Sequence, residues 1–230
     1  AAALLVLFAA SFFMREIAIA DSQRLQTTFL AATSRLACAF IAGVLIISAV
    51  VREFNEKGHL LLLSLALGRT RYVVGKFVGF ALPLLLLCIG AGALVAAVTG
   101  IAPAAPWTLA LALEVGVVAA ASLFAALTLR QVLPAALLVL GFYLLARGFA
   151  GIQLIAHSGL GAEADATGQI MGRVADGLAL LLPRLDLFAA SARLVDGAVP
   201  GGLGAPFAQA VLYCALLLTA TGIDIARRDL

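Results

Sequence analysis

The sequence predicts an all-α membrane protein: six transmembrane helices, a cytoplasmic segment in the membrane interface, and an external helical segment before the last span. Of its 230 residues, 64% are hydrophobic and only 12% are charged. A soluble domain of this length stays far more polar, so most of this chain must face the lipid bilayer. The net charge of +3 is too small to suggest binding to nucleic acid.

The spans follow from the lengths of the apolar runs. A hydrocarbon core of about 30 Å requires about 20 apolar residues per helix, and six segments meet or approach that length. The second segment is short unless it begins within the preceding loop. We expect one transmembrane domain, 1–230, with spans at about 1–19, 36–51, 77–99, 108–129, 132–150 and 207–226.

The chain opens within an apolar run and has no initiator Met. Residues 1–14 carry no charge, and the basic leader region and soluble mature chain that accompany a cleaved signal peptide are absent. We therefore expect the chain to begin inside its first spanning helix, with a cytoplasmic N-terminal piece missing. Arg15 and Glu16 belong near a membrane interface.

Lysine and arginine residues set the expected orientation, because short cytoplasmic loops carry an excess of them. Three connections on one side are basic, and their cations are Arg52, Lys57, Arg69, Arg71, Lys76, Arg130, Arg227 and Arg228. The short loops on the opposite side carry only Arg24 and Arg35. The sequence therefore predicts that the 52–76 connection and both termini face the cytoplasm.

The long connection at 151–206 is then external. It begins with a loop-like stretch, HSGLGAEADATG, and ends with a Gly/Pro linker, DGAVPGGLGAP. Between them, apolar residues recur at helical spacing from Ile170 to Leu182. This spacing predicts a short helix lying on the outer face of the membrane.

The cytoplasmic connection at 52–76 has an order suited to the membrane interface. A polar stretch, REFNEKG, is followed by an apolar one, LLLLSLAL at 60–67, and then by the basic GRTRYVVGK. Such an element lies in the interface with its polar end toward the cytosol. On charge alone, an ordinary positive-inside loop is equally consistent. A simple loop needs only a few residues, however, so this length indicates a segment that contacts something.

This connection resembles the cytoplasmic segment of ABC-2 type transporter permeases, the membrane subunits of ABC exporters. The family pattern runs approximately R-E-x-x-x-G-T-L-E-x-L-L-S-L-P-x-S-R-x-x-x-x-x-G-K. The residues that fit are Arg52, Glu53, Gly58, Leu60, Leu62, Leu63, Ser64, Leu65, Arg69, Gly75 and Lys76. The departures are His59, Leu61, Ala66 and Gly68. LLLPRLDLF at 180–188 and IARRDL at 225–230 also resemble segments of that family.

The resemblance implies a permease subunit in a bacterial cytoplasmic (inner) membrane. In that family the 52–76 segment is the coupling helix, which docks onto a separate cytoplasmic ATPase. Two ATPase copies, carrying ATP and Mg²⁺, and a second copy of the permease or a related one complete the exporter. No cofactor is expected in this chain, and no residue of it is expected to perform covalent chemistry.

The resemblance also assigns residues to roles. The ATPase contact would comprise Arg52, Glu53, Glu56, Lys57, Gly58, Arg69, Arg71 and Lys76. An external gate would comprise Pro183, Asp186 and Phe188.

GRTRYVVGK does not provide a nucleotide site within this chain. A phosphate-binding loop requires GxxxxGK[ST]. Here six residues separate Gly68 from Gly75, and Lys76 is followed by Phe77 rather than by a hydroxyl side chain. Any ATPase is therefore expected to be a separate chain.

Glu114 is the carboxylate expected inside the lipid. Insertion there costs about 2.5–3.5 kcal/mol and indicates a polar partner or pathway. Only Arg130 and Gln131 separate the fourth span from the fifth, so we expect a tight helical hairpin that brings Arg147 near Glu114. A structural pair between these side chains and a contact between Glu114 and substrate are both open.

Other functions find less support in the sequence. A haem-export or copper-site-assembly permease of the same fold would need a cluster of His, Met or Cys, and a metal site is not expected. A hydrolase at His157 and Ser158 lacks the oriented third group of a triad. A membrane scaffold or enzyme without an ATPase remains the alternative from another class. The apolar walls do not specify a substrate.

Overall fold

The computed structural model describes residues 2–17, 22–56, 69–157, 182–185, 188, 194 and 202–227. Within these ranges the chain forms long helices and no strand, which confirms the predicted all-α class. The helices are α1 (Ala2–Ile17), α2 (Ser22–Asn55), α4 (Arg69–Thr99), α5 (Ile101–Leu129), α6 (Val132–His157) and α9 (Gly204–Arg227).

Four of these helices, α2, α4, α5 and α9, are long and apolar enough to cross a membrane. Two others contribute shorter apolar stretches, Ala2–Ser11 in α1 and Val132–Gly148 in α6. Several long apolar helices in one chain are what a multi-pass membrane protein requires, because each span must satisfy its own backbone hydrogen bonds. The chain is therefore described as a membrane protein with at least four candidate spans.

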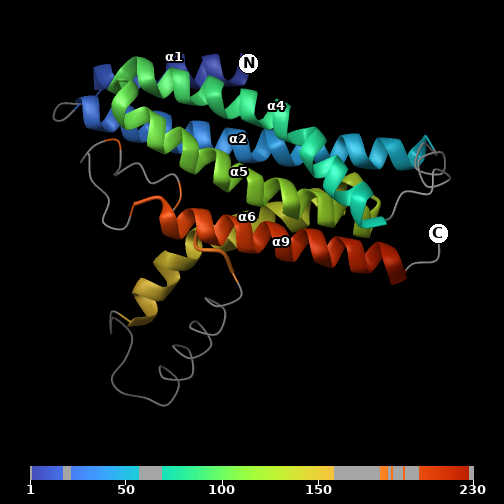
Figure 1. The fold of residues 1–230 in the computed structure, drawn as a ribbon. Helices are drawn as coiled ribbons and strands as arrows, with labels where there is room; N and C mark the ends of the chain where they lie inside the picture. The colour runs from blue at the N-terminus through green and yellow to red at the C-terminus, as the bar shows by residue number, and fades with distance from the viewer. Residues whose placement is uncertain are drawn as a thin grey trace.

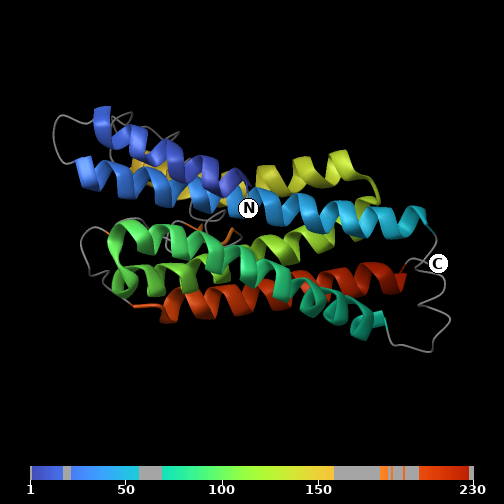
Figure 2. The same cartoon turned by 90° about the horizontal axis from the view of Figure 1, so that it is seen from above.

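Helix α5 is the centre of the bundle. It packs against α2, α4, α6 and α9, while α1 packs against α2. Figure 2 shows α1, α2 and the start of α6 on one side and α4, α5 and α9 on the other. In α5, 72% of the apolar stretch is buried, against 17% in α9. Many buried α5 residues are alanine, and small side chains let helix backbones approach closely in a membrane.

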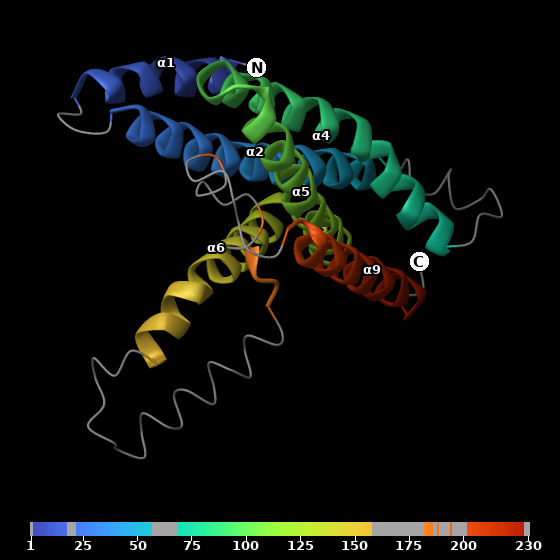
Figure 3. The same ribbon diagram turned by 60° about the vertical axis from the view of Figure 1, so that its left-hand side comes forward.

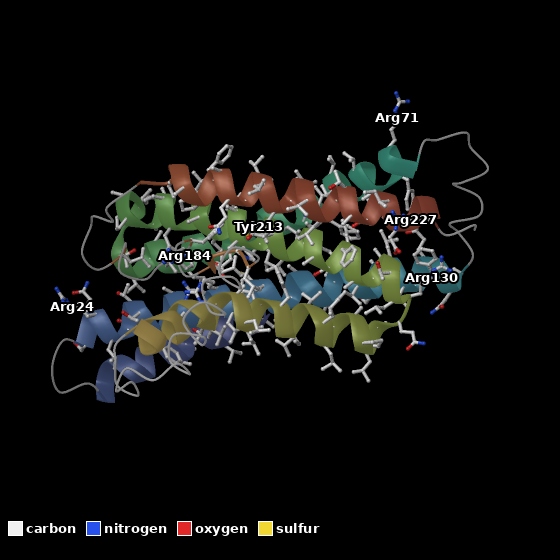
Figure 4. The ribbon with its side chains drawn as sticks, turned by 90° about the horizontal axis from the view of Figure 1, so that it is seen from below. Arg24, Arg71, Arg130, Arg184, Tyr213 and Arg227 are labelled. Atoms are coloured by element: carbon white, nitrogen blue, oxygen red, sulfur yellow. The ribbon has the colours of Figure 1, made fainter. Side chains whose placement is uncertain are left out.

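The bundle has two ends, which we name by their tight turns. At the Arg130 end, α2 and α9 end, α4 begins, and α5 turns into α6 (Figure 1). At the Gly100 end, α2 and α9 begin and α4 turns into α5. Figure 4 shows Arg71, Arg130 and Arg227 at the first end and Arg24 at the opposite one. The labelled arginines are therefore divided between the two ends, because Arg184 also lies toward the Gly100 end.

Both turns depend on a left-handed backbone. Arg130 has φ of 54°, and its N–H donates to the Ala126 carbonyl at 3.0 Å, which caps α5. Gly100 has φ of 88°, in a region that residues with a Cβ rarely adopt. The chain therefore reverses direction within very few residues at each turn. Helix α5 runs antiparallel to α4 before it and to α6 after it.

Helix α2 differs most from the predicted spans. The prediction gave a short segment at 36–51, whereas the helix begins at Ser22 and runs through to Asn55. Residues 22–35 are too polar for a hydropathy argument to include them. Four of their polar side chains are nevertheless buried: Gln26, Thr27, Ser34 and Arg35.

Helix α6 leaves the bundle as it proceeds. Figure 3 shows its second half tilting away from α5 and α9. The predicted external helix at 170–182 lies outside the described residues except for Leu182. Residues 57–68, in the connection predicted to be cytoplasmic, lie outside them entirely. Residues 69–76, which the sequence placed in that connection, form the first turns of α4.

Candidate functional site

Two polar clusters lie within the helical bundle, one at the Arg130 end and one about midway along α5. The Glu53 cluster consists of Glu53 on α2 with Tyr72 and Lys76 on α4. The Glu114 cluster consists of Arg35 on α2, Glu114 on α5, and Tyr143 and Arg147 on α6.

The Glu53 cluster joins α2 to α4 at the Arg130 end. The Tyr72 hydroxyl donates to Glu53 Oε1 at 3.1 Å, and the Lys76 ammonium donates to Glu53 Oε2. Tyr72 and Lys76 share one face of α4, because residues four apart lie one above the other on a helix. The side chains of Lys76 and Glu53 are only 16% and 26% exposed. The cluster therefore joins the end of α2 to the beginning of α4, the two helices that residues 57–68 connect.

Two further contacts tie other helices at the same end. The Arg130 guanidinium lies 5.4 Å from the centroid of the Phe54 ring, which links the end of α2 to the α5–α6 turn. The Thr128 hydroxyl donates to Asp224 Oδ2 at 3.0 Å, which links α5 to α9. Side-chain contacts thus hold α2, α4, the α5–α6 turn and α9 together at the Arg130 end.

Other predicted contact residues point outward. Arg52 and Glu56 pair at 2.8 Å with side chains 78% and 62% exposed, an arrangement that contributes little to stability. Arg71 is exposed, and Figure 4 shows it projecting from the end of the bundle. These three side chains remain accessible to another protein.

The predicted contact set is therefore divided. Arg52, Glu56 and Arg71 face outward, whereas Glu53 and Lys76 face each other. Only the backbone of Arg69 is described, at the start of α4. Lys57 and Gly58 lie outside the described residues.

The Glu114 cluster is buried between α2, α5 and α6. The Tyr143 hydroxyl donates to Glu114 Oε1 at 3.0 Å, and Arg147 Nη1 lies 3.4 Å from the same oxygen. Arg35 lies near Tyr143 and in the field of both Glu114 and Arg147. The pair that the α5–α6 hairpin allows is present within a larger network.

Arg147 also contacts the chain between α6 and α9. Its Nη1 donates to the Leu185 carbonyl at 2.8 Å. Leu185 and Phe188 are fully buried in the core cluster, and Pro183 is buried beside them. Of the three residues predicted to form a gate, Pro183 and Phe188 therefore pack into the bundle, and Asp186 lies outside the described residues.

The sequence prediction omitted Arg35 and Tyr143 from the Glu114 cluster. Arg35 was assigned to a loop, although Arg35, Cys38, Ala42 and Ile46 follow helical spacing and are all buried. Extending that period backward would have placed Arg35 on the buried face of α2. For Tyr143, the signal was its position four residues before Arg147.

Neither cluster has the side chains that a metal site requires. In the part of the chain that the structure describes, no three His, Cys, Asp or Glu side chains lie together in a way that could hold a metal. Each cluster instead joins one carboxylate to cationic and phenolic donors across two or three helices. Such networks position helices and hold charge inside an apolar bundle.

The fold and the clusters define a multi-pass helical membrane protein with ionic contacts between its helices. No protein-family model matches the sequence, and no curated protein matches it.

Proposed function

We propose that this chain is the transmembrane permease subunit of an ATP-driven exporter of the ABC-2 type. The observation that carries the proposal is the 52–76 segment. Its sequence resembles the coupling element of that family, and three of its charged side chains are exposed at one end of the bundle. Arg52, Glu56 and Arg71 give a separate ATPase a charged surface to bind.

The Glu53 cluster supports a mechanical role for the segment. Helices α2 and α4 flank residues 57–68, and Glu53 bonds to Tyr72 and Lys76 across that gap. A force applied to 57–68 would therefore move both helices together. Helix α2 then extends about 25 Å from Arg52 to Arg35, where it enters the Glu114 cluster.

In this proposal, α2 transmits movement from the Glu53 cluster to the Glu114 cluster. ATP binding closes the ATPase dimer, the coupling segment moves, and α2 and α4 carry the movement toward the external side. A pathway between two permeases then opens outward. The chain would cross a bacterial inner membrane six times, with α1 and α6 as additional spans and both termini in the cytoplasm.

The exposed apolar faces of α4 and α9 suit contact with lipid or with a second permease. Only 28% of the apolar stretch of α4 and 17% of that of α9 are buried within the chain. Large residues such as Leu82 and Leu212 are more than half exposed. A second copy of the permease or a related one could cover such faces.

Purification of the tagged chain from its own host in mild detergent tests the proposal. We expect a stoichiometric ATPase to co-purify. The combined change Arg52→Glu and Arg71→Glu should reduce its recovery at least about tenfold, whereas Arg24→Glu, an exposed cation at the opposite end, should not. A correctly inserted protein that never carries an ATPase would contradict the proposal and favour a membrane scaffold without one.

A further inference from the structure

Helix α4 contains a proline in its interior, Pro83. A proline has no backbone N–H, so the carbonyl of Gly79, one turn earlier, lacks the hydrogen bond that a helical carbonyl normally accepts. No water is present in a hydrocarbon core to replace that bond, and glycine weakens a helix because its backbone is less restricted. The hydrogen bonding of α4 is therefore weakest between Gly79 and Pro83.

The part of α4 that follows Pro83 is packed tightly against α5. A Cβ added to Gly92 would lie 2.7 Å from Thr108 Cγ2 on α5, closer than real Cβ atoms approach their neighbours. Ala91 and Val95, on either side of Gly92, are fully buried. Because the two helices are already in close contact here, the second half of α4 has no room to move toward α5.

Beside Pro83, the same two helices leave a cavity between them. Its volume is about 160 Å³, and its apolar lining extends from Phe77 to Cys88 on α4 and from Ala112 to Ala119 on α5. Gly116 lines the cavity, and a Cβ added there would meet nothing within 4 Å. Since protein interiors are normally close-packed, this cavity gives the first half of α4 room to approach α5.

The beginning of α4 is joined to the end of α2. Tyr72 and Lys76 both bind Glu53, and Val73 beside them is fully buried. Closer to Pro83, by contrast, a Cβ added to Gly79 would meet nothing within 4 Å. The first turns of α4 are therefore anchored to α2, and the second half is anchored to α5. The weakest part of the helix lies between these two anchors.

We propose that α4 is hinged between Gly79 and Pro83. Its first half, 69–79, bends toward α5 into the cavity, while its second half, 84–99, stays in contact with α5. The bend is a property of this chain and requires no partner. Its use in transport rests on the function proposed above, in which a force on residues 57–68 reaches α4 before the hinge and bends it.

The expected movement is large enough to measure. Val74 precedes Pro83 by about 14 Å along the helix axis. A bend of about 20°, at the low end of sharp proline kinks, displaces Val74 by about 5 Å. Ile89 follows Pro83 in the half that stays in contact with α5, so its position should not change. The two residues therefore report separately on the two halves of α4.

Double electron–electron resonance tests the hinge on the chain purified with any partners and placed in lipid nanodiscs. One spin label is attached at Leu137 on α6 and the other at Val74 or at Ile89, which are all exposed. Cys214→Ala removes the cysteine that is not fully buried. We expect the distances from Val74 to be distributed over about 5 Å more than those from Ile89. Equal widths of the two distributions would overturn the proposal.

Two substitutions should narrow the wider distribution by different routes. Pro83→Ala restores an N–H for the Gly79 carbonyl and strengthens the helix at the hinge. Gly116→Leu fills the cavity from α5 and leaves α4 itself unchanged. Gly90→Leu is the matched control, because it also replaces a helix glycine whose added Cβ meets nothing within 4 Å, and Gly90 does not line the cavity. A distribution that stays equally wide in Gly116→Leu and Gly90→Leu would contradict the proposed movement into the cavity.

The hinge and the proposed exporter function can fail separately. A wide distribution from the first half of α4, in a chain that never carries an ATPase, would support the hinge and contradict only the exporter. A chain that carries an ATPase but gives two equal distributions would overturn only the hinge, because α4 would then move as one rigid helix.

Discussion

The two clusters repeat one local arrangement at different depths. In each, a tyrosine hydroxyl donates to a glutamate Oε1, and a cation four residues after the tyrosine binds the same carboxylate group. The first combines Glu53 with Tyr72 and Lys76 at the ends of α2 and α4. The second combines Glu114 with Tyr143 and Arg147 inside the bundle.

Their surroundings make the clusters different. The Glu53 side chain is 26% exposed and meets one cation, so water and salt share in its stabilisation. Glu114 is fully buried and serves two guanidinium groups and a phenol. The same combination of side chains therefore forms a partly solvated contact at a helix end and a fully buried charged centre inside the membrane. Removing one partner should have a much larger effect in the second.

The largest effect is expected from Glu114→Ala. It leaves Arg35 and Arg147 in an apolar bundle without their carboxylate, and breaking such a buried pair costs about 3–5 kcal/mol. The matched change Glu53→Ala should cost about 1 kcal/mol. Unfolding of the purified protein in mixed micelles with increasing SDS measures both. Equal losses would mean that depth does not distinguish the two clusters.

The packing of the helices that carry the clusters gives the next effect. Gly92 on α4 lies against Thr108 on α5, and an added Cβ would meet Thr108 Oγ1 and lie 2.7 Å from Thr108 Cγ2. Gly92→Ala should therefore destabilise the protein by about 1–3 kcal/mol through overpacking.

A control and a rescue accompany that change. At Gly90, two residues away, an added Cβ meets nothing within 4 Å, so Gly90→Ala should have little effect. Combining Gly92→Ala with Thr108→Ala removes the obstructing atoms and should restore most of the stability. Equal unfolding curves for the two glycine variants would show that α4 can move away from α5 freely.

A double-mutant cycle measures the coupling within the Glu53 cluster. Glu53→Gln and Lys76→Met, singly and together, should give a coupling energy of about 1 kcal/mol that falls as salt is raised from 0.05 to about 0.5 M. The equivalent cycle with Glu114→Gln and Arg147→Met should give a coupling that depends little on salt. A coupling at Glu53 that is insensitive to salt would place this cluster in lipid rather than at its edge.

The smallest effect on stability is expected at the exposed pair. Arg52→Glu should leave the unfolding transition unchanged, because Arg52 and Glu56 are largely in solvent. When it is combined with Arg71→Glu, the Arg52→Glu change should reduce the amount of ATPase that co-purifies, as proposed above. A clear loss of stability would show that Arg52 supports the end of α2 rather than contacting a partner.

The sequence by itself determined the class of the molecule. The amount and length of the apolar runs require helices in lipid, and the described residues form six helices and no strand. Three of the cations that the sequence predicted on one side, Arg71, Arg130 and Arg227, lie at one end of the bundle (Figure 4). These features depend on composition and local periodicity, which a single chain displays directly.

The interaction partners across the bundle were decided only by the tertiary structure. Hydropathy assigned Arg35 to a loop, because an average over a window cannot show that a polar side chain turns toward partners on another helix. The division of the 52–76 cations into exposed and internal ones likewise depends on how α2 meets α4, since Lys76 reaches Glu53 across a long separation in sequence. Local pattern establishes which segments become helices, and helix packing determines which of their charges meet.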